Sequence, residues 1–96
     1  MPTNAQADRF RRDFAALTAA QKAAFQAAAA KFGVDLASGG FRPGLRVKGV
    51  LGAAGVFQMT WAEDGRASVE FGAAVREGET HIVWRHAGTR DIFTRP

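Results

Sequence analysis

Basic side chains recur at strand spacing through the second half of the sequence, and they are the residues best suited to chemistry. Arginine and lysine alternate there with apolar residues, as in the run from Leu45 to Lys48. Because successive side chains of a strand point to opposite faces, the pattern predicts one basic and one apolar sheet face. The residues predicted on the basic face are Arg46, Lys48, Arg66 and Arg85, with His86 and Arg90 near the end of the last strand. Such a face can bind phosphate or carboxylate groups.

The composition fits a single domain with an anionic partner. The chain has 96 residues, a formal net charge of +4 and a sequence pI near 10.7, which favours nucleic acid or an acidic protein segment as the partner. A solvated basic surface without a partner is the alternative. Cysteine is absent, which excludes disulfides, thiolate catalysis and cysteine-bound zinc. No apolar run approaches the roughly 20 residues that cross a bilayer. The segment MPTNAQADRF lacks the apolar core of a signal peptide, so we expect a cytoplasmic protein that does not act at a membrane.

Two helix starts and two apolar stripes predict a helical hairpin over about residues 4–33. Each start has the spacing of a capping box, in which a hydroxyl and a glutamine side chain satisfy each other's backbone amides: Thr3 with Gln6, and Thr18 with Gln21. The apolar residues that follow recur at helical spacing: Phe10, Phe14 and Leu17, then Phe25, Ala28, Ala29 and Phe32. The polar residues of the first stripe, including Asp13, are predicted to face water. Gly33 is the predicted C-terminal cap.

Four strands are predicted after a glycine-rich loop. They cover residues 45–50, 56–61, 66–71 and 81–86. The apolar residues that alternate with the polar ones in these strands, including Trp61 and Trp84, are predicted to lie on the face that packs against the helices. The first six residues show no strand pattern, so no strand is predicted before the hairpin. The expected fold class is therefore α+β: a single domain over residues 1–96, with the hairpin on one face of a four-stranded antiparallel meander over about residues 45–93.

The two histidines, His81 and His86, fall on opposite faces of the last strand by strict alternation. A shared metal site is therefore not predicted, and no cofactor is expected. His86 is instead a candidate for proton transfer, because it lies close to Arg90 in the sequence.

The order of a helical hairpin and a basic meander resembles the RelE/ParE-like toxins of bacterial type II toxin-antitoxin systems. The stretches that carry the resemblance are LRVKGVLG leading into GVFQMTW, then DGRASVEF, HIVWRHAGTR and a terminal aromatic residue. The resemblance implies a RelE-like fold, a small basic toxin, and a cognate antitoxin protein that holds the toxin inactive. In its ribonuclease branches such a toxin cuts mRNA, typically on the ribosome. The reaction transfers a phosphodiester to the neighbouring ribose 2′-hydroxyl and uses no metal ion.

The resemblance also implies roles for individual residues. Arg46 and Lys48 match the family's first-strand basic pair, and Lys48 is the better proton acceptor of the two. Arg66 matches the arginine that holds the scissile phosphate. Arg90 lies where several branches carry an arginine or a histidine, and Phe93 matches the aromatic residue that closes the site. The expected site also includes His86 as a further catalytic residue and Arg85 as a further phosphate-binding residue.

The sequence departs from the family pattern in three places. It shows no strand before the hairpin, it contains no tyrosine, and it carries Arg90 in place of a histidine. An arginine stays charged at any ordinary pH and cannot carry protons as a histidine does.

Two other functions fit the same residues. A non-catalytic domain of this fold could inhibit a protein target, as the ParE-type toxins inhibit DNA gyrase. A basic domain could also bind RNA without any chemistry, in which case its affinity should fall steeply with salt.

Overall fold

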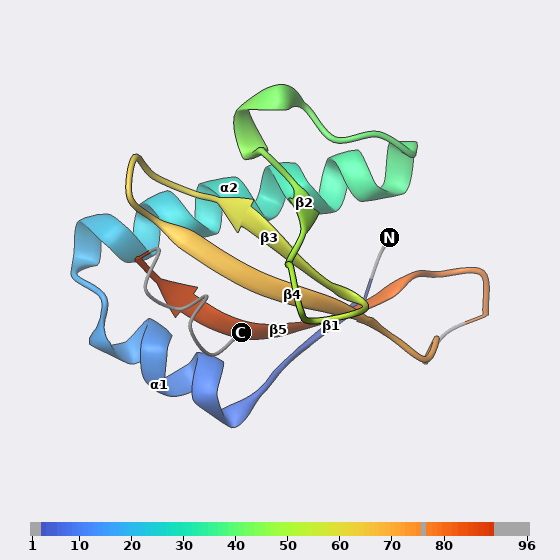
Figure 1. The fold of residues 1–96 in the computed structure, drawn as a ribbon, viewed down its shortest axis with the longest axis horizontal. Helices are drawn as coiled ribbons and strands as arrows, with labels where there is room; N and C mark the ends of the chain where they lie inside the picture. The colour runs from blue at the N-terminus through green and yellow to red at the C-terminus, as the bar shows by residue number, and fades with distance from the viewer. Residues whose placement is uncertain (1–2, 76, 90–96) are drawn as a thin grey trace.

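The computed structural model describes residues 3–75 and 77–89. Within these ranges the elements are, in chain order, β1 (Thr3–Gln6), α1 (Asp8–Ala16), α2 (Ala19–Ser38), the 3-10 helix η1 (Pro43–Leu45), β2 (Lys48–Gly49), β3 (Val56–Thr60), β4 (Arg66–Gly72) and β5 (His81–Gly88). Helix α2 packs across one face of the sheet, and α1 lies beside β5 (Figure 1). The expected α+β class is confirmed. None of the described helices is long and apolar enough to cross a bilayer.

The sheet has five strands in the order β1-β5-β4-β3-β2. Strands β2 to β5 form the predicted antiparallel meander. The expectation of no strand before the helices is wrong, because β1 pairs in parallel with β5 from Thr3 opposite His81 to Gln6 opposite Trp84. An edge strand is held by backbone hydrogen bonds, so it needs no alternating apolar pattern. The Thr3 hydroxyl also lies 2.8 Å from Nδ1 of His81, and this threonine caps no helix.

The second predicted helix start is confirmed, and the other helix boundaries differ from the prediction. Thr18 and Gln21 form a complete capping box, with bonds of 2.8 and 3.1 Å. Helix α1 begins after Ala7, without a side-chain cap. Helix α2 does not end at Gly33 but continues to Ser38, and Gly39 caps it with a left-handed φ of 90°. A glycine inside a helix costs only about 1 kcal/mol, and beyond Gly33 the buried Asp35 side chain accepts hydrogen bonds from Arg42.

The first predicted strand, residues 45–50, shrinks to the two residues of β2. Pro43 begins the 3-10 helix η1, and Leu45 ends it with its side chain buried. Arg46 follows with φ 48°, in the left-handed region. That conformation cannot continue a pleated strand, so pairing starts only at Lys48.

An aromatic cluster joins both helices to the sheet. The Trp84 ring lies 5.2 Å from Phe25, 5.4 Å from Phe32 and 6.1 Å from Phe10, measured between centroids. Trp61 is buried too, so the prediction that both tryptophans pack in the core is confirmed. Phe71 of β4 is 44% exposed. Among the described aromatic rings, its ring contacts only that of Phe57, with centroids 5.4 Å apart and an angle of 74° between the planes.

Candidate functional site

Three of the predicted cations meet on the sheet face that α2 leaves open. Arg46, Lys48 and Arg66 line a hollow of about 200 Å³, together with Val47, Gln58 and Thr60. The strand register explains the meeting, since Lys48 pairs with Gln58 on β3 and Arg66 pairs with Thr60 two residues further along. Cross-strand partners share a face. We call this hollow the sheet pocket.

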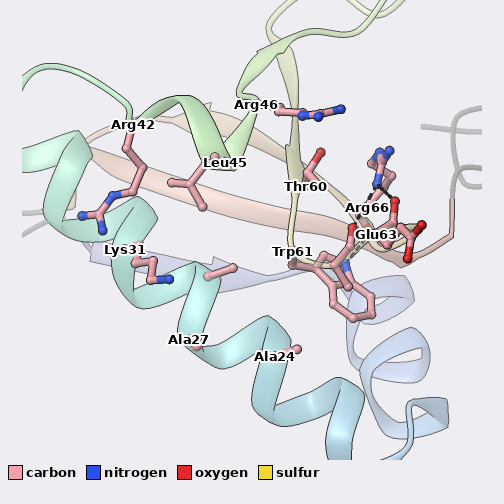
Figure 2. A pocket seen from close by; sticks show the side chains of 13 residues that line it. Ala24, Ala27, Lys31, Arg42, Leu45, Arg46, Thr60, Trp61, Glu63 and Arg66 are labelled. Carbon is pink, nitrogen blue, oxygen red and sulfur yellow. Dashed lines mark hydrogen bonds between the residues drawn. The ribbon is translucent and has the colours of Figure 1, made fainter.

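Arg46 reaches the sheet pocket from a strained backbone position. Among the described residues it is the only non-glycine with a positive φ. A left-handed conformation of this kind costs a side-chain-bearing residue on the order of 1 kcal/mol or more and is often found at functional sites. Figure 2 shows the Arg46 and Arg66 side chains extending into the same space beside Thr60.

Arg66 is held by the hairpin turn that precedes β4. Its Nη1 donates to three carbonyl oxygens, those of Ala62 at 3.3 Å, Glu63 at 3.2 Å and Gly65 at 2.9 Å. Its own carbonyl accepts a bond of 2.9 Å from Nε1 of Trp61. All hydrogen bonds from its side chain to the described residues come from Nη1. The turn therefore fixes one edge of the guanidinium, while the side chain also lines the sheet pocket.

Gly65 is required in that turn by the Trp61 ring. A Cβ at position 65 would lie 2.6 Å from a ring carbon of Trp61, far inside van der Waals contact. Because the ring is itself fixed by its bond to the Arg66 carbonyl, it cannot move aside freely. The close approach of this turn to Trp61 helps to set the position of Arg66.

The predicted cations of β5 lie apart from the sheet pocket. Nη1 of Arg85 is 3.2 Å from Oε2 of Glu70 on the neighbouring strand. Arg85 is also the extra residue of a β-bulge, because Val69 pairs with Trp84 while Ser68 pairs with His86. Arg90 and Phe93 lie outside the described residues.

The bulge changes the face that His86 occupies. Ser68 lies on the sheet face opposite to that of its neighbour Ala67 in the core, and His86 is the cross-strand partner of Ser68. Both side chains are buried. The extra residue thus reverses the alternation along β5, and His81 and His86 share one face. The prediction that they lie on opposite faces is wrong for this reason. Within residues 3–75 and 77–89, no three His, Asp or Glu side chains are grouped to hold a metal ion.

Asp13 of α1 is a partner of His86 that the sequence pattern missed. Its Oδ2 lies 3.5 Å from Nδ1 of His86 and accepts a 3.2 Å hydrogen bond from the Ala87 amide. The expectation that Asp13 faces water is wrong, because α1 packs beside β5. Burial lowers the pKa of His86, and the charges of Arg9 and Arg85 lower it further, against an opposing effect of Asp13.

We predict that folding stability falls as the pH drops below about 6.5, the ordinary pKa of histidine. In the unfolded chain His86 takes up its proton near this pH, whereas in the folded protein it does so only at lower pH. Between the folded and the unfolded pKa the unfolded state therefore binds more protons. Stability is fully present above this window and declines through it. Urea unfolding of wild type and His86→Gln, from neutral pH to about pH 5, checks the prediction. Equal pH dependence in the two proteins would contradict it.

Comparison with known proteins finds a shared fold. The chain is similar to a chain of the RelB-RelE antitoxin-toxin complex from Methanococcus jannaschii, with a TM-score of 0.60, 15% sequence identity, and coverage of 93% of each chain. At that identity the likeness concerns the fold, which is RelE-like. No protein-family model matches the sequence. No curated protein matches it either.

Proposed function

We propose that this protein is the toxin of a type II toxin-antitoxin pair and acts in the cytoplasm as a metal-independent endoribonuclease on mRNA. The observation that carries the proposal is the convergence of Arg46, Lys48 and Arg66 on one pocket of a RelE-like sheet. The similar chain comes from an antitoxin-toxin complex, which supports a cognate antitoxin as the partner here. The basic open face of the sheet is the surface that we expect the antitoxin to cover.

The proposed chemistry is attack of a ribose 2′-hydroxyl on the adjacent phosphodiester. The new bond joins the 2′-oxygen to phosphorus, the bond from phosphorus to the 5′-oxygen breaks, and a 2′,3′-cyclic phosphate results. Lys48, exposed at the pocket rim, is proposed to take the hydroxyl proton. Arg46 and Arg66 are proposed to stabilise the charge that develops on the phosphorane oxygens.

His86 is less well placed for the same phosphate. Lys48, Gln58, Ser68 and His86 follow one another across four strands, so the Lys48 and His86 backbones are separated by about 14 Å at the usual strand spacing. The His86 ring also faces Asp13. We therefore assign the first proton transfer to Lys48. We keep His86 as the candidate for protonating the leaving 5′-oxygen, and Arg90, which stays charged, as a candidate for stabilising charge on the phosphate.

A second candidate function is a non-catalytic module that inhibits a protein target or simply binds RNA. One observation favours it, namely that Nη1 of Arg66 is already used by three turn carbonyls. A purely structural arginine would look the same.

The two functions are separated by cleavage of a defined mRNA, tested on the free mRNA in the presence of EDTA and on ribosomes in a magnesium buffer. We expect cleavage, and a product that ends in a 2′,3′-cyclic phosphate. A single 2′-deoxy substitution at the cut position should abolish cleavage there and leave other positions unaffected, because it removes the nucleophile. Cleavage that survives this substitution, or that requires a metal ion, would contradict the proposed chemistry. Growth arrest in cells without any RNA cleavage would favour the inhibitory module.

A further inference from the structure

A second, larger hollow lies next to the sheet pocket, between α2 and the turn that precedes β4. Its volume is about 680 Å³, and Figure 2 shows it bounded by α2 on one side and by η1 and the residues around Trp61 on the other. Arg46, Thr60 and Arg66 line both hollows. The two hollows therefore adjoin at these three residues. We call the second hollow the helix groove.

The wall that α2 gives to the helix groove is made of small side chains and ends in a cation. Ala24, Ala27 and Ala28 lie on one helix face, and Lys31 follows one turn after them on the same face. Lys31 is exposed and forms no ion pair with any described residue. Over these alanines the groove has room for a flat group, and the ammonium at its end favours a negative charge.

The opposite wall is fixed by a strong ion pair. Nε and Nη2 of Arg42 donate to the two carboxylate oxygens of Asp35, each at 2.8 Å, and the Arg42 amide donates to Oδ2 at 3.0 Å. These bonds lower the pKa of Asp35 to about 2. Because Asp35 compensates the charge of Arg42, the pair chiefly ties the segment before η1 to α2. The cations left for an anionic ligand are Lys31 in the groove and Arg46 and Arg66 at its junction with the sheet pocket.

We propose that the helix groove binds the single-stranded RNA that flanks the phosphate held in the sheet pocket, with a base over the alanines and a phosphate beside Lys31. Single-stranded RNA carries one charge per nucleotide and a flat base between charges. The alanines of α2 and the cations Lys31, Arg46 and Arg66 match this pattern, in a lining that also holds the carboxylate of Glu63. Only the identity of the central phosphate as the scissile one rests on the proposed function. Binding in the groove does not depend on cleavage.

The test uses fluorescent 2′-O-methyl oligonucleotides, which lack the nucleophile, so that binding is measured without cleavage. We expect a dodecamer to be long enough to occupy both the sheet pocket and the helix groove, and a trinucleotide to bind at the sheet pocket alone. We expect Ala27→Glu to weaken dodecamer binding on the order of tenfold and to leave trinucleotide binding unchanged, because the new carboxylate repels phosphate only in the groove. Ala23→Glu is the matched control: residue 23 is exposed on the same helix and lines no described hollow.

Charge removal gives a second, independent readout. Lys31→Ala should weaken dodecamer binding and reduce the slope of log affinity against log salt by about 0.7, the value for one phosphate contact to a single strand. Lys22→Ala, which removes a charge from the other side of α2, where Lys22 lies over the Phe14 ring, should leave that slope unchanged.

Several results would overturn the inference. Equal dodecamer affinities for Ala27→Glu and Ala23→Glu would show that the groove holds no RNA. Unlabelled RNA and an oligoglutamate peptide can each be tested for displacing the dodecamer. If the peptide displaces it at the lower concentration, the groove binds an acidic protein segment. Failure of the ribonuclease proposal looks different, since wild-type protein would then bind the dodecamer, show the Ala27→Glu effect, and cleave no RNA.

Discussion

Arg66→Ala is expected to lower the rate of RNA cleavage by about 10² or more, the effect of removing one donor that stabilises charge in a transition state. The guanidinium is fixed by the turn before reaction, so it need not reorganise as charge develops on phosphorus. Arg66→Lys keeps the charge but loses the planar fork, and we expect it to recover only a small part of the rate. Single-turnover cleavage of the defined mRNA measures both.

The control for this prediction must separate catalysis from folding. Losing the bonds to three turn carbonyls should also cost about 1–3 kcal/mol of unfolding free energy, so rates are compared at temperatures where both variants are fully folded. Arg11→Ala removes an exposed arginine from α1 and should cleave like wild type. A fully folded Arg66→Ala protein that retains wild-type cleavage would exclude Arg66 from the reaction.

Trp84→Ala is expected to cost about 3–5 kcal/mol of unfolding free energy, the range for removing a large buried aromatic side chain. The ring contacts aromatic side chains from both helices, so its loss opens a cavity where α1, α2 and β5 meet. For a domain of this size that is a large part of the total stability. Urea unfolding followed by far-UV circular dichroism measures the change.

Leu51→Ala is the matched truncation for the stability measurement, because Leu51 is 99% exposed and buries no surface. It should change the unfolding free energy by less than about 0.5 kcal/mol. A Trp84→Ala protein as stable as the Leu51→Ala protein would mean that the aromatic cluster does not hold the two layers together.

The parts of the fold that are visible in the sequence are those set by periodicity and local capping. The capping box of Thr18 and Gln21, the buried aromatic stripe and the alternation of β3 and β4 all depend on near neighbours in the chain. Strand β1 could not be found this way, because its pairing with β5 joins residues 78 positions apart through backbone bonds. The continuation of α2 past Gly33 depends on Asp35 and its bonds to Arg42, which no local pattern reveals.

The site shows the same division. The alternation of apolar and basic residues predicted Arg46, Lys48 and Arg66 on one face of the sheet. The structure places all three around one pocket. The left-handed backbone of Arg46 and the bulge at Arg85 interrupt the strict alternation of side chains, so a pattern with a period of two does not predict them. No sequence pattern identified Lys31 and Asp13 as site residues, because the residues near them in the structure belong to segments that are distant in the sequence.

We propose that this protein, which has a RelE-like fold, cuts mRNA with the cations of the sheet pocket. The most direct test of this proposal is induced expression in a bacterial host of wild type beside Arg66→Ala, followed by primer extension on total RNA. We predict new 5′ ends within messages for wild type, and their loss in the variant at equal levels of folded protein. Growth arrest without new ends, or the same ends from both proteins, would contradict the account.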